Sequence, residues 1–360
     1  MTSEINDIRT PAELKGFSFS KYKKTEVKQQ FIDSMIKGKI EPACHWCAEL
    51  VCAGHYEDVW ESIFYFVGKH IHTGNPKIAV YLDKRYTVFR NIMNQGHYTS
   101  VLQLRNNPTI RQLFAELITV ITMSNKKPSF ETVKINRAEE FDMTQMTYRL
   151  KATHNNFAEP VMHSEDPKEL IIAMNEFAFN VGGQNPNMLQ ACYWIEWIIE
   201  FDVICKKRKE PCLCKRRSID VENKYQRDII WIVWDVLVFY ADVKSPFIKS
   251  VISSLRNLFA SRYTTGACRR RKYLMYFAVE MITETVRTDI ELMTIQCKEM
   301  LPSIIGRIDQ IYKQIKKNED SPNTDYLFNN LEQQNTMEKT LQKMNMMNSV
   351  DFVSKQEGDA

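Results

Sequence analysis

The sequence predicts an all-α protein, and three observations support this prediction. Only 11 glycines and 12 prolines occur in 360 residues, too few for the many turns that sandwiches and barrels need. Apolar residues recur at helical spacing along most of the chain. A helix-start signature, a capping residue followed by proline, occurs five times. Because 44% of the residues are apolar, the chain can bury a sizeable core.

The first two helices are predicted from apolar spacing and from glycine. An apolar stripe at helical spacing runs from Val27 to Ile36, and Gly38 is suited to end that helix. A second helix is expected between Pro42, which suits a first turn, and Gly54, which suits a stop. The apolar period then continues after Gly54, so a third helix is expected there.

The five capping pairs predict where later helices begin. They are Asn75-Pro76, Asn107-Pro108, Asp166-Pro167, Asn185-Pro186 and Ser245-Pro246. Each precedes an apolar run, and Asn, Asp and Ser are favoured caps while proline fits the first turn. We interpret all five as helix caps and none as a binding site.

Composition divides the chain into five parts. They are a flexible N-terminal arm (1–22), an N-terminal helical unit (23–124), a connecting segment (125–165), a C-terminal helical unit (166–317) and a disordered tail (318–360). The connecting segment is polar and lacks sustained periodicity, and a short strand or helix fits within it. No fixed-period repeat is present. The expected architecture is an array of antiparallel helix pairs, and a solenoid-like stack remains an option.

Two helices in the C-terminal unit are apolar almost all round, over 188–205 and 229–240. Such helices are normally central to a packed unit. Glu196 and Glu200 lie one turn apart in the first of them, and we interpret them as partners for Arg or Lys or as a polar edge. The longest apolar run, 229–241, contains Asp235 and is about half the length that a membrane span requires.

Charge and cysteine content indicate which binding partners and which cellular compartment the sequence favours. The net charge is +4, too small for a general nucleic-acid binder unless the charge is clustered. The nine cysteines are odd in number, and residues 1–30 lack the apolar core of a secretory leader. These features favour a reducing compartment with free thiols.

One group of residues resembles a metal site. Cys44, Cys47 and His55 would share a face of one helix, and thiolates and imidazoles at such spacing can bind zinc. A single helix cannot close a tetrahedron, so a second segment would have to contribute. Packing in the core is the stronger interpretation, since cysteine is among the most buried residue types. No cofactor is predicted.

Two basic clusters are candidates for nucleic-acid binding, because lysine and arginine contact phosphates by charge and hydrogen bonding. Their residues are Lys206, Lys207, Arg208, Lys209, Lys215, Arg216, Arg217, Arg269, Arg270, Arg271 and Lys272. A solvated basic surface is the alternative. The first cluster also contains Cys212 and Cys214, and neighbouring cations are expected to lower the pKa of both thiols.

The common enzyme signatures are missing. The sequence has no G-x-x-x-x-G-K-[ST] phosphate loop, no G-x-G-x-x-G and no G-x-S-x-G. These absences make a nucleotide-using enzyme or a serine hydrolase less expected. An enzyme with another kind of site is a third hypothesis, with Glu196, Glu200, Asp235 and the histidines of the first half as its candidate residues.

Four segments carry a resemblance to a protein family. They are 43–55 (ACHWCAELVCAGH), 70–77 (HIHTGNPK), 104–108 (LRNNP) and 194–202 (WIEWIIEFD). The chain resembles, over roughly residues 20–300, a family of helical proteins from large nucleocytoplasmic DNA viruses of the mimivirus and phycodnavirus type. The resemblance implies a virion or a virus factory in the host cytoplasm as the setting. It assigns no catalytic residues.

The sequence therefore favours a viral helical scaffold or protein-interaction protein, without enzymatic activity, that binds other viral proteins. The alternative is a nucleic-acid-associated protein of replication or transcription that binds through residues 206–217 and 269–272.

Overall fold

The fold is all-α, as predicted. The computed structural model describes residues 3–96, 98, 100–141 and 146–320. These residues contain 13 α-helices, five short 3-10 or π-helical segments and no β-strand. Of the tail predicted over 318–360, residues 318–320 are described and contact the N-terminal segment, and the rest lies outside the described residues.

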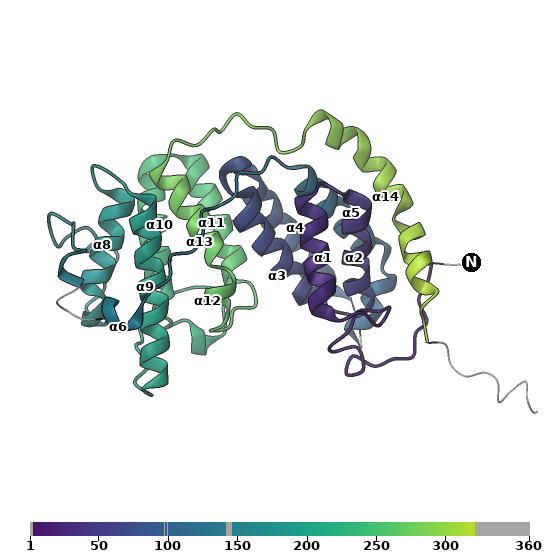
Figure 1. Ribbon diagram of the computed structural model, residues 1–360, viewed down its shortest axis with the longest axis horizontal. Helices are drawn as coiled ribbons and strands as arrows, with labels where there is room; N and C mark the ends of the chain where they lie inside the picture. Colours follow the sequence, from purple (N-terminus) through teal and green to yellow (C-terminus); the bar gives the residue numbers. More distant parts are fainter. Residues whose placement is uncertain (1–2, 97, 99, 142–145, 321–360) are drawn as a thin grey trace, which may run out of the picture.

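The N-terminal unit is a bundle in which consecutive helices pack as neighbours (Figure 1). Its helices are α1 (Lys24–Ile36), α2 (Ile40–Cys52), α3 (Tyr56–Phe66), α4 (Lys77–Gln95) and α5 (Pro108–Met123). The α2 helix packs against α1, α3 and α5. Short loops join α1 to α2 and α2 to α3, and the left-handed turns at Gly38 and Gly54, with φ of 71° and 78°, lie in these loops.

The C-terminal unit is arranged around one central helix, α13 (Lys272–Thr283). Its other helices are α8 (Ile171–Gly182), α9 (Met188–Lys207), α10 (Ile230–Lys244), α11 (Pro246–Ala260) and the short α12 (Ala267–Arg270). Every residue of α13 from Tyr273 to Ile282 is buried, since α8, α9, α10 and α11 all contact this helix. The apolar character of α9 and α10 agrees with the central positions predicted for them.

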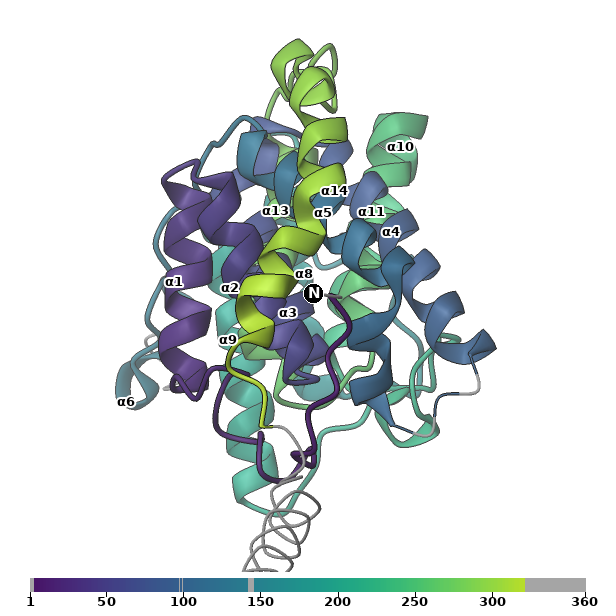
Figure 2. The ribbon, with the colours of Figure 1, turned by 90° about the vertical axis from the view of Figure 1, so that its right-hand side faces the viewer.

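The last helix, α14 (Ile295–Lys316), returns to the N-terminal unit and packs on α5 and α2. Figure 2 shows α14 lying across the face of that unit. Tyr312 is 1% exposed there, and the Arg111 guanidinium lies 4.1 Å from the centre of its ring. The predicted C-terminal boundary of the C-terminal unit, residue 317, is therefore wrong, since α14 packs on the N-terminal unit. The apolar pattern of a helix predicts that one face is buried, but it does not predict which unit buries that face.

The N-terminal segment also differs from the prediction of a flexible arm. Its residues Ile5, Leu14 and Phe19 are at most 2% exposed. Asp7 and Arg9 form a buried ion pair, and the Asp7 carboxylate also accepts a hydrogen bond from the backbone of Asp320. The few apolar residues of this segment are thus enough to hold it beside the end of α14 (Figure 2).

Two of the five capping pairs act as predicted. The Asn107 side chain accepts hydrogen bonds from Thr109 and Ile110 at the start of α5, and Ser245 caps α11 in the same way. The α9 helix is capped by Asn187, two residues after the predicted Asn185.

The other two pairs form tertiary contacts. Asn75 is 1% exposed, and its Nδ2 donates a hydrogen bond to the Leu292 carbonyl at 3.1 Å. This bond joins Asn75 to the segment between α13 and α14. Asp166 is 5% exposed and accepts hydrogen bonds from Arg217. These side chains are buried by other elements, which a local pattern does not reveal.

The connecting segment crosses from one unit to the other and contains a short helix, α6 (Arg137–Glu140), as the sequence allowed. Phe130 stacks on Tyr276 of α13 with ring centres 5.1 Å apart. Phe141 stacks on Trp197 of α9 at 4.8 Å. The segment therefore packs along the C-terminal unit and is more than a linker.

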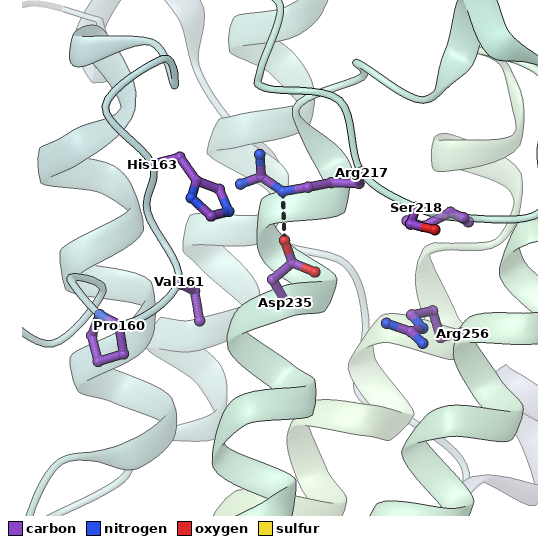
Figure 3. Close-up of a pocket in the computed structure, with 8 residues that line it drawn as sticks. Pro160, Val161, His163, Arg217, Ser218, Asp235 and Arg256 are labelled. Carbon is purple, nitrogen blue, oxygen red and sulfur yellow. Dashed lines mark hydrogen bonds and ion pairs between the residues drawn. The ribbon is translucent and has the colours of Figure 1, made fainter.

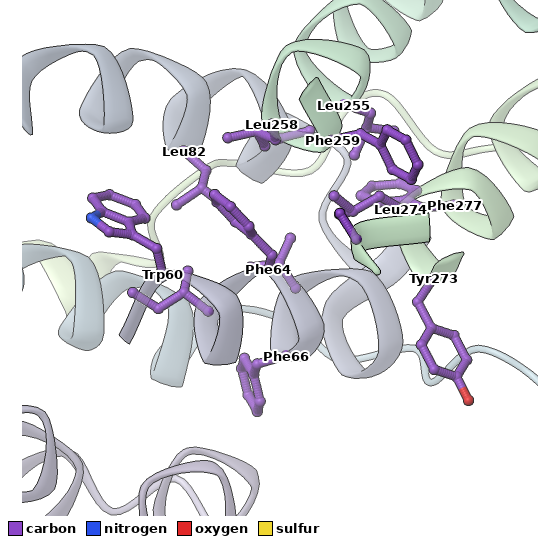
Figure 4. Close-up of a cluster of buried hydrophobic side chains, with 14 of the residues drawn as sticks. Trp60, Phe64, Phe66, Leu82, Leu255, Leu258, Phe259, Tyr273, Leu274 and Phe277 are labelled. Atoms are coloured by element: carbon purple, nitrogen blue, oxygen red, sulfur yellow. The ribbon is translucent and has the colours of Figure 1, made fainter. Parts of the chain in front are cut away.

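The two units meet where α3 and the π-helical segment η1 (Val67–Ile71) contact α13, and where α4 contacts α11. Figure 4 shows Phe64 of α3 in an apolar cluster with Leu258 of α11 and Leu274 of α13. Gly68 permits the close approach, because a Cβ there would lie 3.0 Å from the Tyr273 carbonyl carbon.

We predict opposite effects for two glycine-to-alanine changes. Gly68→Ala should lower the free energy of unfolding by about 1–3 kcal/mol through overpacking at the junction. Gly306→Ala should raise it by up to about 1 kcal/mol, because among the described residues nothing outside the backbone of its own helix lies within 4 Å of an added Cβ. Urea unfolding followed by circular dichroism measures both. Equal effects of the two changes would contradict the close packing assigned to Gly68.

Candidate functional site

Glu196 and Glu200 are partners for basic side chains, as the sequence predicted. Glu196 lies 3.1 Å from the Lys272 ammonium and also accepts a hydrogen bond from the Tyr276 hydroxyl. Glu200 pairs with Arg137 and Arg269. These ion pairs give the two carboxylates a structural role.

Arg217, predicted to contact nucleic acid, lies inside the C-terminal unit. Its guanidinium donates to both carboxylate oxygens of Asp166, at 2.9 and 2.8 Å. It also donates to Asp235 at 2.7 Å, as Figure 3 shows. Burial would lower the pKa of this group, but the bonds to Asp166 and Asp235 outweigh burial and raise it. A cavity of about 270 Å³ adjoins this network and is also lined by Pro160, Val161, His163, Ser218, Ile219 and Arg256.

Arg271, from the second basic cluster, is buried as well. Only 5% of its side chain is exposed. It pairs with Glu61 of α3 at 2.6 Å and donates to the carbonyls of Phe259 and Ser261 at 2.7 and 2.6 Å. Arg217 and Arg271 are therefore not free to contact nucleic acid, because their guanidinium groups are buried and bond to carboxylates and carbonyls of the same chain.

Seven of the eleven predicted cations form ion pairs within the chain. The seven are Lys206, Lys215, Arg217, Arg269, Arg270, Arg271 and Lys272. The other four, Lys207, Arg208, Lys209 and Arg216, are exposed and make no ion pair with described residues. The two clusters do meet, since Lys206, Lys207 and Arg269 line one cavity of about 380 Å³.

The suggested metal ligands are not brought together. Cys44 and Cys47 are 2% exposed in the core of the N-terminal unit. The Nε2 atom of His55 lies 2.9 Å from the Leu14 carbonyl and 2.7 Å from the Phe17 carbonyl. Within the described part of the chain, no group of three His, Cys, Asp or Glu side chains is placed to hold a metal ion.

The expectation of activated thiols at Cys212 and Cys214 is wrong. Burial raises the pKa of each thiol to about 12. For Cys214, the neighbouring Arg217 acts in the opposite direction but does not overcome burial. Of the basic residues around these thiols, Lys206, Lys215 and Arg217 pair with carboxylates, and the other four are exposed to solvent. None of the nine cysteines forms a disulfide.

We predict slow alkylation of the thiols in the native protein. At pH 8, iodoacetamide should modify Cys212 and Cys214 at least ten-fold more slowly than in the unfolded chain, because the thiolate is the reactive form. Mass spectrometry of timed samples measures the rates. Labelling of either thiol as fast in the native protein as in urea would contradict the raised pKa values.

A polar cluster at the junction of the units was not anticipated from the sequence. Glu280 of α13 is 4% exposed and receives a hydrogen bond from Thr73 at 2.7 Å. The Nδ1 atom of His72 lies 2.8 Å from its other oxygen, and Lys127 forms a further ion pair. Burial opposes ionisation of Glu280, but His72, Lys127 and Thr73 outweigh it and lower its pKa to about 2. The one signal in the sequence was a glutamate inside the apolar run 273–282.

A groove of about 870 Å³ lies between the two units. Its inner wall is aromatic and comes from α3 and α4. The wall residues are Tyr56, Trp60, Phe64, Tyr86 and Phe89. Its rim carries α3 carboxylates on one side and arginines of the 261–271 segment on the other. We call this cavity the inter-unit groove.

Ion pairs cross the inter-unit groove. Arg262 lies 2.6 Å from Glu57, and Arg271 lies 2.6 Å from Glu61. Each pair joins the C-terminal unit to α3. The charged groups of the groove are therefore matched to one another and hold its two sides in place.

No family model, no curated protein and no solved structure matches this chain. The resemblance to large DNA viruses stays a prediction. No helix in the described residues is both long and apolar enough to cross a membrane.

Proposed function

We propose that this protein is a non-enzymatic helical scaffold that binds a segment of another protein in the inter-unit groove. The observation that carries the proposal is the groove itself, a large cavity with an aromatic inner wall at the junction of two units. Ligand sites of about 300–1,000 Å³ occur preferentially at such junctions.

The lining of the inter-unit groove suits a peptide segment with an apolar anchor. Aromatic side chains dominate the energetics of protein interfaces, where buried anchors fill pockets surrounded by polar rims. Phe89 and the half-buried Met93 of α4 both line the groove, and Arg90 and Asn94, which also line it, are exposed. An apolar side chain flanked by charged residues of both signs complements this arrangement.

The charge of the groove does not favour a polyanion. Five basic and five acidic side chains line it: Lys28, Arg90, Arg262, Arg270 and Arg271, with Glu57, Asp58, Glu61, Asp220 and Glu222. Nucleic-acid interfaces are strongly positive, since their affinity comes largely from contacts with phosphates. A balanced groove supports a protein partner.

Nucleic-acid binding through residues 206–217 and 269–272 remains the second candidate function. Its support is that Lys206, Lys207 and Arg269 line one cavity. The ion pairs within the chain weaken it, because a paired cation contributes less to phosphate binding. A virion or a virus factory as the setting, with other viral proteins as partners, stays a prediction from the resemblance.

Photo-crosslinking tests the proposed function. A benzophenone side chain placed at Asn94, exposed at the rim of the groove, should yield an adduct with another protein in extracts of the native source. The same group at Lys249, exposed on α11 outside the groove, should not. The adduct at Asn94 should survive nuclease treatment, since the proposed partner is a protein.

A matched pair of charge reversals gives the control. Glu57→Lys breaks a rim ion pair of the groove and should reduce the Asn94 adduct about ten-fold or more through like-charge repulsion. Asp242→Lys breaks an equally exposed pair with Lys249 and should leave the adduct unchanged. Equal adducts at Asn94 and Lys249, or an adduct that nuclease removes, would overturn the proposal.

A further inference from the structure

A second cavity, which shares only Tyr263 with the lining of the inter-unit groove, is formed by the C-terminal half of α9, the start of α10 and the 263–269 segment. Its volume is about 380 Å³, and we call it the α9–α10 cavity. One wall is aliphatic and consists of Ile198, Ile199, Val203, Ile229 and Ile230. This wall suits the apolar body of a small ligand.

The inner end of the α9–α10 cavity carries an excess of negative charge. The Lys206 ammonium lies 2.6 Å from Asp202 and 4.0 Å from Asp228, so one cation faces two carboxylates. The Tyr263 hydroxyl donates to Asp228 at 2.9 Å, and Cys268 lies 2.9 Å from the same hydroxyl. Burial raises the pKa of Asp228, which Lys206 and Tyr263 oppose.

One acceptor at this inner end has no donor. The Oδ1 atom of Asp202 is buried and has no hydrogen-bond partner among the described residues. A buried carboxylate oxygen without a donor is costly, by roughly 1–3 kcal/mol or more. Asp202 itself lines the cavity, so its carboxylate is placed to attract the positively charged N–H group of a ligand.

The outer end of the α9–α10 cavity carries an excess of positive charge. Lys207 is exposed there and makes no ion pair with a described residue, and Arg269 is half exposed beside its partner Glu200. Thr265 and Gly266 are exposed at the same end. This end can bind a carboxylate.

We propose that the α9–α10 cavity binds a free α-amino acid with an apolar side chain. The ammonium group of the ligand faces Asp202 and Asp228, its carboxylate faces Lys207 and Arg269, and its side chain lies on the aliphatic wall of the cavity. A zwitterion matches both charge excesses, whereas an anion or a cation matches one of them. Buried charge-assisted hydrogen bonds of this kind are among the strong ones.

Calorimetric titration with three probes tests the proposal. The probes are L-leucine, 4-methylpentanoate, which lacks the ammonium group, and L-leucinamide, which lacks the carboxylate. Leucine should bind, and each analogue should bind about ten-fold or more weakly, since each loses one charged contact. Binding of 4-methylpentanoate or leucinamide as tight as that of leucine, or no binding of leucine at about 10 mM, would overturn the proposal.

Variants assign the two ends of the ligand. Asp202→Asn should remove the advantage of leucine over 4-methylpentanoate. The double change Lys207→Ser and Arg269→Ser should remove its advantage over leucinamide, and because these residues are exposed, this variant tests the proposal even if Asp202→Asn does not fold. The matched control is Lys209→Ser with Arg216→Ser, two exposed cations outside this cavity and outside the inter-unit groove, which should leave all three affinities unchanged. Preserved selectivity in both cavity variants would also overturn it.

Discussion

The carboxylate of Glu280 is buried where the two helical units meet, and the junction is organised around it. Three groups from the N-terminal side of the junction, His72, Thr73 and Lys127, approach its two oxygens. An isolated buried charge is costly, so this arrangement is stable only while all of these groups stay in place. His72 also stacks on Phe277, with ring centres 5.0 Å apart, which ties the polar cluster to the apolar packing around it.

Both proposed binding sites depend on this junction. The inter-unit groove has one side on α3 and the other on the segment that leads into α13, so its width follows from how α3 and α13 pack. Arg271, at the start of α13, bonds to Glu61 of α3 and to backbone carbonyls after α11. The α9–α10 cavity shares the 263–269 segment with the same region. Arg271, one of the cations predicted from the sequence to contact phosphates, thus helps to fix the position of the helices that form the groove.

Features that depend on residues close together in the sequence could be predicted, whereas contacts between residues far apart in the sequence could not. Helix periodicity and the caps at Asn107 and Ser245 are local, and they were predicted correctly. Asn75 and Asp166 have the same local pattern, yet both bond to residues distant in the sequence, which a cap motif does not encode. The ion pairs of Arg217 and the return of α14 to the N-terminal unit are likewise long-range. The groove combines residues from α1, α3, α4, α12 and the loops between helices, so no single motif could have revealed it.

The free energy of unfolding as a function of pH, measured for the wild-type protein and Glu280→Gln, tests the role of Glu280 most directly. The pKa of Glu280 is about 2 in the folded protein and near 4.5 when unperturbed, so its ionisation stabilises the fold above about pH 5 and ceases to do so as the pH falls toward 2. A shift of this size corresponds to a stabilisation on the order of 3 kcal/mol. The account predicts that the wild-type protein is more stable than the variant at pH 6 and that the difference shrinks by about this amount toward pH 2. A difference that is absent at pH 6, or that does not change with pH, would contradict it.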